Sequence, residues 1–247
     1  MNTVIMNLLW LRPGHVGGSE TYVTQLLKAL NKSDNSPPIE LVMTPAARRA
    51  HQFLDTDFTI TEQDPPLGRV GRIWRENRLF GQLDDQQLVH HLGGTVPKCR
   101  TTKKTVVTIY DVQYRDYPQY FSLAKRRYLD GAIQRSLEQA EAVCTLSKYC
   151  AKSLELHFGY PEKKCHIVPP AIDGPSSQQS QPPESKQFLF YPAVTWPHKA
   201  HEFLITLLEQ LPDLQLILTG AAGTSHRRVM NAIRRSPAAD RITHLGL

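Results

Sequence analysis

The sequence has few of the features that mark disulfide-rich, zinc-binding or membrane-spanning proteins. Its cysteines are Cys99, Cys144, Cys150 and Cys165, and none of them forms a C-x-x-C pair. This spacing predicts neither a zinc site nor a disulfide framework, so reduced thiols are expected. The apolar stretch at residues 1–11 contains two asparagines and is too short to span a bilayer. We therefore expect a cytoplasmic protein, at most in peripheral contact with the inner face of a membrane.

Several catalytic and nucleic-acid-binding motifs are also missing. There is no G-x-S-x-G turn and no H-E-x-x-H segment, so the common nucleophile-elbow hydrolases and zinc proteases are not supported. The net charge is +6, from 29 Lys and Arg against 23 Asp and Glu. Such a positive balance is typical of enzymes that bind phosphates, of proteins that contact an anionic membrane and of nucleic-acid-binding proteins. Because no nucleic-acid-binding motif accompanies the charge, we expect no nucleic-acid partner and keep that function only as an alternative.

Short apolar runs alternate with segments of helical periodicity along most of the chain. These runs cover residues 4–10, 39–43, 87–91, 105–110, 142–146 and 164–168. Apolar strands separated by helices predict an α/β fold with a parallel sheet. Within this pattern, Ser147 is predicted to cap a helix at 148–157, because its hydroxyl can accept from a free backbone N–H.

A change in composition divides the chain. Pro, Ser and Gln dominate residues 171–186, which are predicted to be a linker. The alternation of strands and helices then restarts at residue 188 and continues to the last residue. We therefore expect a first domain at 1–170 and a second, shorter unit at 187–247.

The first candidate site follows the first predicted strand. Gly17 and Gly18 come directly before a helix, where small residues let a ligand approach the backbone. The free N–H groups and partial positive charge of a helix start suit a phosphate or a sugar hydroxyl. The segment matches neither G-x-G-x-x-G nor a P-loop, so a nicotinamide or P-loop nucleotide site is not supported. The alternative interpretation is a plain tight turn.

Two further candidate sites lie at the ends of predicted strands. His90 and His91 are neighbours in a strand, so their side chains point to opposite faces and do not share a metal easily. Tyr110 and Asp111 end the strand that follows, where ligands of parallel sheets commonly bind. The alternative for Asp111 is a capping role before an irregular loop. No metal site is predicted.

The second unit repeats the pattern of strand, loop and helix. The loop that begins at Thr195 carries Lys199 at a helix start, where its charge and the helix dipole act on the same anion. This arrangement suits a diphosphate, and the alternative is a solvated lysine on a surface turn. Gly220 lies in a loop of small residues that admits a nucleotide or simply turns the chain.

Several segments in one order resemble a known family. They are GGSETYVTQLLKAL, HHLGGTVPK, TVVTIYDVQYRDYP, the linker entry PPAID, and WPHKAH followed by LILTG. Together they are similar to the retaining glycosyltransferases of group 1, also called family 4, which have the two-domain GT-B fold. The resemblance implies transfer of a sugar, of the hexosyl type, from a nucleotide-sugar donor to a hydroxyl acceptor. The acceptor would be a saccharide or a lipid-linked saccharide in polysaccharide or glycolipid biosynthesis, and no obligatory cofactor or metal is implied.

The resemblance also assigns roles to residues. The first domain would bind mainly the acceptor, and the second mainly the nucleotide. The donor-binding residues would be Gly17, Gly18, Thr195, Lys199 and Gly220. Tyr110 and Asp111 would be catalytic, and His90 and His91 would bind the acceptor.

Three departures from the family pattern bear on activity. Many members have His where this chain has Tyr110, and many carry an Arg shortly before the residue that corresponds to Lys199. The sequence ends at Leu247, before the pair of carboxylates that contacts the donor in the family. We therefore expect one complete Rossmann-like domain with the first half of a second, and an enzyme truncated at its C-terminal side. Its alternatives are an inactive chain and a non-catalytic fragment that binds the acceptor or a partner.

Overall fold

The computed structural model describes residues 1–247 except 1–2, 65–67, 84–85, 99–103, 172–186 and 247. The chain divides into two compact units, residues 1–174 and 175–247. Each unit has its own sheet and core and is described by itself. All of the predicted linker 171–186 except its first residue lies outside the described residues.

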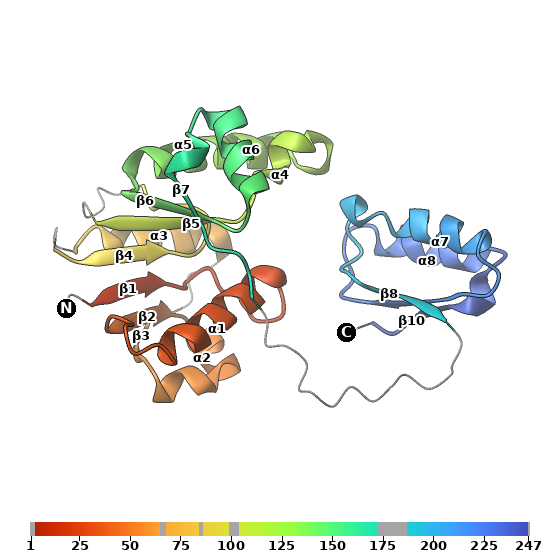
Figure 1. Ribbon diagram of the computed structural model, residues 1–247, viewed down its shortest axis with the longest axis horizontal. Coiled ribbons are helices and arrows are strands. Elements are labelled where there is room, and N and C mark those ends of the chain that lie inside the picture. The colour runs from red at the N-terminus through yellow and green to blue at the C-terminus, as the bar shows by residue number, and fades with distance from the viewer. Residues whose placement is uncertain (1–2, 65–67, 84–85, 99–103, 172–186, 247) are drawn as a thin grey trace. The chain divides into compact units, whose positions relative to one another are not determined.

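The first unit is built on a parallel sheet of seven strands in the order β3-β2-β1-β4-β5-β6-β7 (Figure 1). The strands are β1 (Val4–Asn7), β2 (Ile39–Met43), β3 (Thr59–Glu62), β4 (Leu88–His91), β5 (Thr105–Ile109), β6 (Ala142–Thr145) and β7 (Cys165–Ile167). From β1 the chain moves outward to β2 and β3, and it then returns to place β4 on the other side of β1. The strand order therefore reverses between β1 and β4.

Helices connect these strands. They are α1 (Gly18–Asn31), α2 (Pro45–Ala50), α3 (Gly68–Phe80), α4 (Gln113–Asp116), α5 (Leu123–Gln139) and α6 (Lys148–Phe158). Short 3-10 turns, η1 (Gln52–Thr56), η2 (Pro118–Tyr120) and η3 (Glu162–Lys164), fill the longer connections. The predicted cap at Ser147 is confirmed, since its hydroxyl accepts from the backbone N–H of Cys150.

Apolar side chains cover both faces of this sheet. Leu8, Leu27 and Leu41 are fully buried in a cluster that joins β2 to α1. Ile5 and Phe80 belong to a separate cluster that joins β1 to α3. Because successive strand residues point to opposite faces, a sheet covered on both sides needs continuously apolar strands, as the sequence has.

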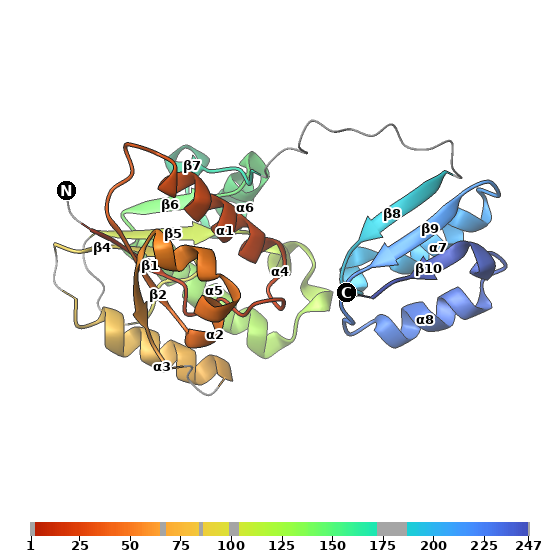
Figure 2. The same ribbon diagram turned by 90° about the horizontal axis from the view of Figure 1, so that it is seen from below.

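The second unit has the same layout on a smaller scale. Its described strands are β8 (Phe188–Pro192), β9 (Gln215–Thr219) and β10 (Ile242–His244), which pair in parallel in the order β10-β9-β8 (Figure 2). Its helices are α7 (His201–Glu209) and α8 (His226–Arg235), with the 3-10 turns η4 (Pro197–Lys199) and η5 (Ala239–Arg241). Ile205, Leu208 and Leu216 are central to its core. The predicted fold class, parallel α/β in both units, is confirmed.

No helix in the described part of the chain combines the length and the apolar character needed to cross a bilayer.

Candidate functional site

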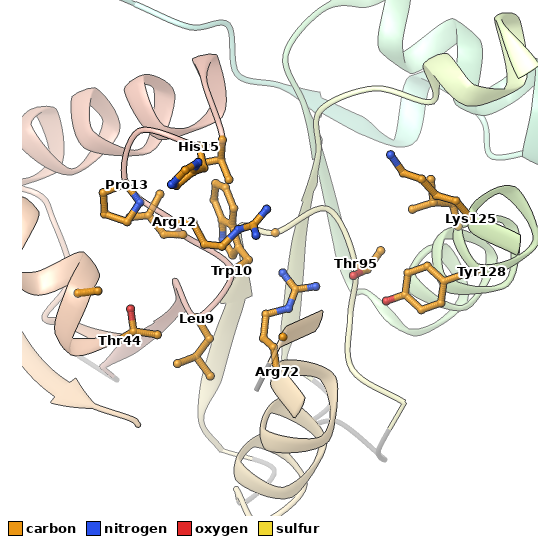
Figure 3. Close-up of a pocket in the computed structure, with 16 residues that line it drawn as sticks. Leu9, Trp10, Arg12, Pro13, His15, Thr44, Arg72, Thr95, Lys125 and Tyr128 are labelled. Carbon is orange, nitrogen blue, oxygen red and sulfur yellow. The ribbon is translucent and has the colours of Figure 1, made fainter. Parts of the chain in front are cut away.

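A cavity of about 940 Å³ opens at the carboxyl ends of β1, β2 and β4 in the first unit (Figure 3). It is lined by the loop after β1, by Thr44 after β2, and by Gly93 and Thr95 after β4. The strand order reverses between β1 and β4, so the loops leaving these strands diverge. A crevice at such a switch point is the usual ligand site of an open α/β sheet.

Side chains from three elements supply positive charge to this cavity. Arg12 comes from the loop after β1, Arg72 from α3 and Lys125 from the first turn of α5. Figure 3 shows the guanidinium groups of Arg12 and Arg72 extending into the same space. None of the described residues that line the cavity is Asp or Glu. The cavity is therefore suited to an anionic ligand.

Gly17 and Gly18 lie exposed beside the loop that lines this cavity. Gly17 caps α1 with φ 64°, a left-handed conformation that favours glycine, and no side chain caps the helix. The loop is held by Glu20, whose Oε2 accepts from the N–H of Gly14 at 2.9 Å and whose Oε1 lies 3.0 Å from His51 Nε2. The first N–H groups of α1 are thus open to a phosphate or a hydroxyl.

Tyr110 is packed between aromatic rings at the end of β5. Its ring centroid lies 6.0 Å from that of Trp10 and 5.7 Å from that of Tyr22. Its hydroxyl donates to the carbonyl of Leu92 at 2.8 Å, and burial raises the pKa of Tyr110. This phenol is therefore protonated at neutral pH and fixes the loop after β4 to the end of β5.

Asp111 follows at the surface. Its Oδ1 accepts from the backbone N–H of Gln113 at 3.0 Å, which forms a local turn before α4. Asp111 is not the N-cap of that helix, since Val112 holds that position. Tyr110 and Asp111 line a second cavity of about 320 Å³, which also includes Gly94. The carboxylate of Asp111 is therefore both a structural acceptor and a polar group at a cavity wall.

The two histidines of β4 lie within the sheet on opposite faces. His91 is fully buried, its Nδ1 accepts from Asn7 Nδ2 at 3.1 Å, and its ring packs at 5.0 Å against Phe80. Burial lowers the pKa of His91 to about 3. His90 Nε2 lies 2.8 Å from Thr108 Oγ1, and burial lowers the pKa of His90 to about 4. Both rings are neutral at pH 7, and neither residue lines either cavity.

Thr195 and Gly220 join the two loops at the carboxyl ends of β8 and β9. Thr195 is fully buried, and its hydroxyl accepts from the N–H of Gly223 at 2.7 Å. Gly220 has φ 133°, and a Cβ there would lie within 2.4 Å of the carbonyl oxygen of Ala193. The absence of side chains at Gly220 and Gly223 thus allows the loops to touch through their backbones.

Lys199 is exposed at the end of η4, directly before α7. None of the ion pairs in the described part of the chain involves its ammonium group. No side chain caps α7, so its first N–H groups are open as well. A cation beside an uncapped helix start can hold a phosphate.

The predicted residues therefore fall into three groups. Gly17 and Gly18 follow directly after Val16, the last residue of the loop after β1 to line the larger cavity. Tyr110 and Asp111 line the smaller one, and the remaining donor-binding candidates share the strand ends of the second unit. The cations that line the larger cavity were not predicted as site residues. Lys125 belongs to a basic cluster in the sequence, but only the strand order shows that it shares a cavity with Arg72.

Ala200, next to Lys199, has the one left-handed backbone among the described residues other than glycine, with φ 50° and ψ 38°. A Cβ in this region costs roughly 1 kcal/mol. We expect Ala200→Gly to raise the free energy of unfolding of the second unit by about 0.5–1 kcal/mol in urea titrations. Ala200→Val should lower it, because a β-branched side chain fits this region worse. An Ala200→Gly variant that is less stable than the native chain would contradict this assignment.

Comparison with known proteins agrees with the observed fold. Residues 16–174, more than half of the chain, match the family model described as Glycosyltransferase Family 4. No curated protein matches the chain. Among solved structures, HepE of Anabaena in complex with UDP and glucose has a TM-score of 0.64 at 14% identity, covering 100% of this chain and 70% of that one.

Two further solved structures are similar. Sucrose-phosphate synthase from Thermosynechococcus elongatus has a TM-score of 0.65 at 17% identity, with 100% of this chain and 70% of that chain covered. The lipopolysaccharide outer core galactosyltransferase WaaB has a TM-score of 0.56 at 13% identity, with 100% and 68% covered. At these identities the likeness establishes the fold, which is that of the GT-B glycosyltransferases. With the family match over residues 16–174, the chain belongs to Glycosyltransferase Family 4.

Proposed function

We propose that this protein acts in the transfer of a hexosyl group from a nucleotide-sugar to a hydroxyl acceptor, with retention at the anomeric carbon. The family match over residues 16–174 is the observation that carries this proposal. The complex of HepE with UDP-glucose supports a nucleotide-sugar donor for a protein of this fold. A saccharide or lipid-linked saccharide, in polysaccharide or glycolipid biosynthesis, is the acceptor class that we propose. The proposed reaction needs no resident cofactor.

Donor-binding residues are proposed in each unit by itself: at the strand ends of the second unit, and at the start of α1 in the first. Negative charge builds on the diphosphate as the bond to the sugar breaks, and Lys199 is placed beside an open helix start to neutralise it. Gly17 and Gly18 offer backbone N–H groups without a side chain in the way. Thr195 and Gly220 contribute by holding the loops of the second unit in place.

Residues at the smaller cavity are proposed to contact or position the reacting groups. Asp111 is the exposed carboxylate there, and we propose that it accepts a hydrogen bond from a substrate hydroxyl. Tyr110 has its hydroxyl committed to the carbonyl of Leu92, so it acts by positioning the loop after β4. His90 and His91 support the same sheet edge from within and keep no role in direct acceptor contact in this proposal.

Donor binding gives a direct test of this function. We expect isothermal titration with UDP-glucose, GDP-glucose and ADP-glucose to detect binding of at least one donor. Lys199→Gln should weaken that binding about tenfold, since a charge-assisted hydrogen bond contributes roughly 1.5–3 kcal/mol and tenfold corresponds to about 1.4 kcal/mol. Binding is measured before turnover because the chain spans about 70% of the length of solved glycosyltransferases.

The matched control is Arg235→Gln, which removes an exposed positive charge from the last turn of α8. This variant should bind the donor as the native chain does. Failure of all the nucleotide-sugars to bind would count against the proposed function. Equal weakening by Lys199→Gln and Arg235→Gln would show that Lys199 acts only through net charge.

A further inference from the structure

We propose that the larger cavity of the first unit binds an anionic group, a phosphate or a carboxylate, on the sugar acceptor. This inference rests on the proposed function and adds the chemical class of the acceptor. Arg12 from the loop after β1 and Arg72 from α3 extend into one space, and Lys125 and Tyr128 extend from α5 (Figure 3). A group with several acceptor oxygens is the ligand that such a set of donors fits.

The positive charges of Arg12 and Arg72 are poorly balanced by carboxylates of the described residues. Arg12 forms no ion pair with a described residue. Arg72 faces one carboxylate, Glu76, with Arg72 Nε and Glu76 Oε1 3.9 Å apart, and Glu76 Oε1 also accepts from Asn7 Nδ2 at 3.2 Å. Burial raises the pKa of Glu76, which weakens it further as a counter-charge. An added anion would therefore complete the electrostatics of the site.

Unused hydrogen-bond donors point to the same ligand class. The Nε of Arg72 is buried and has no hydrogen-bond partner among the described residues. The indole Nε1 of Trp10, which also lines the cavity, is buried and unpartnered in the same way. Buried donors without acceptors are costly, and a small shift of these two side chains toward a ligand rich in oxygen would satisfy them. A neutral sugar could occupy such a cavity but would leave the charges of Arg12 and Arg72 uncompensated.

The cavity is separate from the proposed phosphate position at the start of α1. Gly17 and Gly18 are exposed and are not among its lining residues, which end along this loop at Val16. The volume of about 940 Å³ is within the range of small-molecule sites and is large enough for a saccharide with its charged substituent. The cations of the cavity are therefore assigned to the acceptor, and the donor diphosphate to the helix start.

The test compares charged and neutral sugars on the full chain. Saturation-transfer NMR titrations would use glucose 6-phosphate, glucuronate and glucose, with UDP as the donor-side probe. We expect at least one of the charged sugars to bind ten times more tightly than glucose or better. Arg12→Gln should remove most of that difference and leave UDP affinity unchanged. Arg12 is exposed and touches no described carboxylate, so this variant keeps the fold.

Arg72→Gln is the second variant, and Arg78→Gln is its matched control on the same helix. Arg78 is exposed on α3, stacks on the ring of Trp74 and lies outside the cavity lining. Loss of charged-sugar binding in Arg72→Gln with normal binding in Arg78→Gln would support the inference. Equal affinity for glucose and the charged sugars would overturn it. It would also be overturned if Arg12→Gln lost affinity for UDP but kept its affinity for the charged sugars. A chain that binds a nucleotide-sugar but does not prefer charged sugars keeps the proposed function and loses this inference.

Discussion

Replacing Gly220 by alanine should destabilise the second unit by about 3–5 kcal/mol, enough to unfold a unit of this size. The new Cβ would lie 2.4 Å from the carbonyl oxygen of Ala193 and 2.9 Å from the backbone nitrogen of Val194. These neighbours are backbone atoms, so relief requires the two loops to separate. The φ of 133° adds strain, because residues with a side chain rarely adopt it.

Hydrogen exchange with mass spectrometry can follow this effect in the intact chain, because it reports on peptides from each unit. Peptides from β8 and β9 should lose their protection in Gly220→Ala, while peptides from β1 and β4 should keep theirs. Both units have separate cores, so the first unit is expected to be unaffected.

Variants at two other glycines of the second unit separate the effect of backbone strain from the effect of the steric contact. Gly246→Ala introduces a side chain at φ 74° but in open space, so strain alone should cost about 1 kcal/mol. Gly223→Ala brings a Cβ within 2.6 Å of the carbonyl oxygen of Thr195 without a left-handed φ, so it isolates the contact. If Gly220→Ala destabilised the second unit no more than Gly246→Ala does, the loops after β8 and β9 would not touch as described.

The stability of the first unit should fall as the pH drops from about 6.5 toward 4, because of His90 and His91. Their pKa values are lowered by burial to about 4 and about 3, while an unfolded histidine has a pKa near 6.5. Below pH 6.5 the unfolded chain binds protons that the folded chain does not, so acid favours unfolding. The stabilisation by the neutral rings is full above about pH 6.5. At pH 4 the free energy of unfolding should be lower by on the order of 3 kcal/mol for each of the two histidines.

Urea midpoints measured between pH 8 and 4 would detect this loss. Glu76 acts in the opposite direction, because its raised pKa lets the folded state take up a proton more readily. The contribution of the histidines is therefore measured as a difference between variants. His90→Gln keeps a polar group near Thr108 but does not titrate, so its stability should change less with pH than that of the native chain.

His166→Gln is the matched control, since His166 is exposed on β7. This variant should follow the pH dependence of the native chain. If the slope of stability against pH were the same in His90→Gln as in the native chain, the buried histidine would not be the source of acid sensitivity.

Local sequence patterns predicted much of the fold and little of the geometry of the site. The apolar runs located the strands, and Ser147 marked a helix start, because burial and capping depend on residues a few positions apart. His91 shows where such patterns end. A histidine beside a Gly-Gly turn was predicted to contact the acceptor, yet it lies in the core against Asn7 and Phe80, which are 84 and 11 positions away along the chain.

The larger cavity shows the same limit. Arg12, Arg72 and Lys125 carry no shared motif, and each is ordinary within its own segment. They come together because β4 pairs with β1 and not with β3, the strand that precedes it in the chain. As a result, the loop after β1 and the helices α3 and α5 all supply residues to one cavity. The order of strands depends on pairings between distant segments, which local periodicity does not encode.

The sequence by itself determined the parallel α/β class, the family resemblance and the glycines that border helix starts, because these depend on local composition and spacing. Only the tertiary structure decided which charged residues share a cavity, that the phenol of Tyr110 is committed to the carbonyl of Leu92, and that both histidines of β4 are neutral. The physical reason is that burial and electrostatic environment are set by strand order and helix packing, which bring together side chains far apart in the chain.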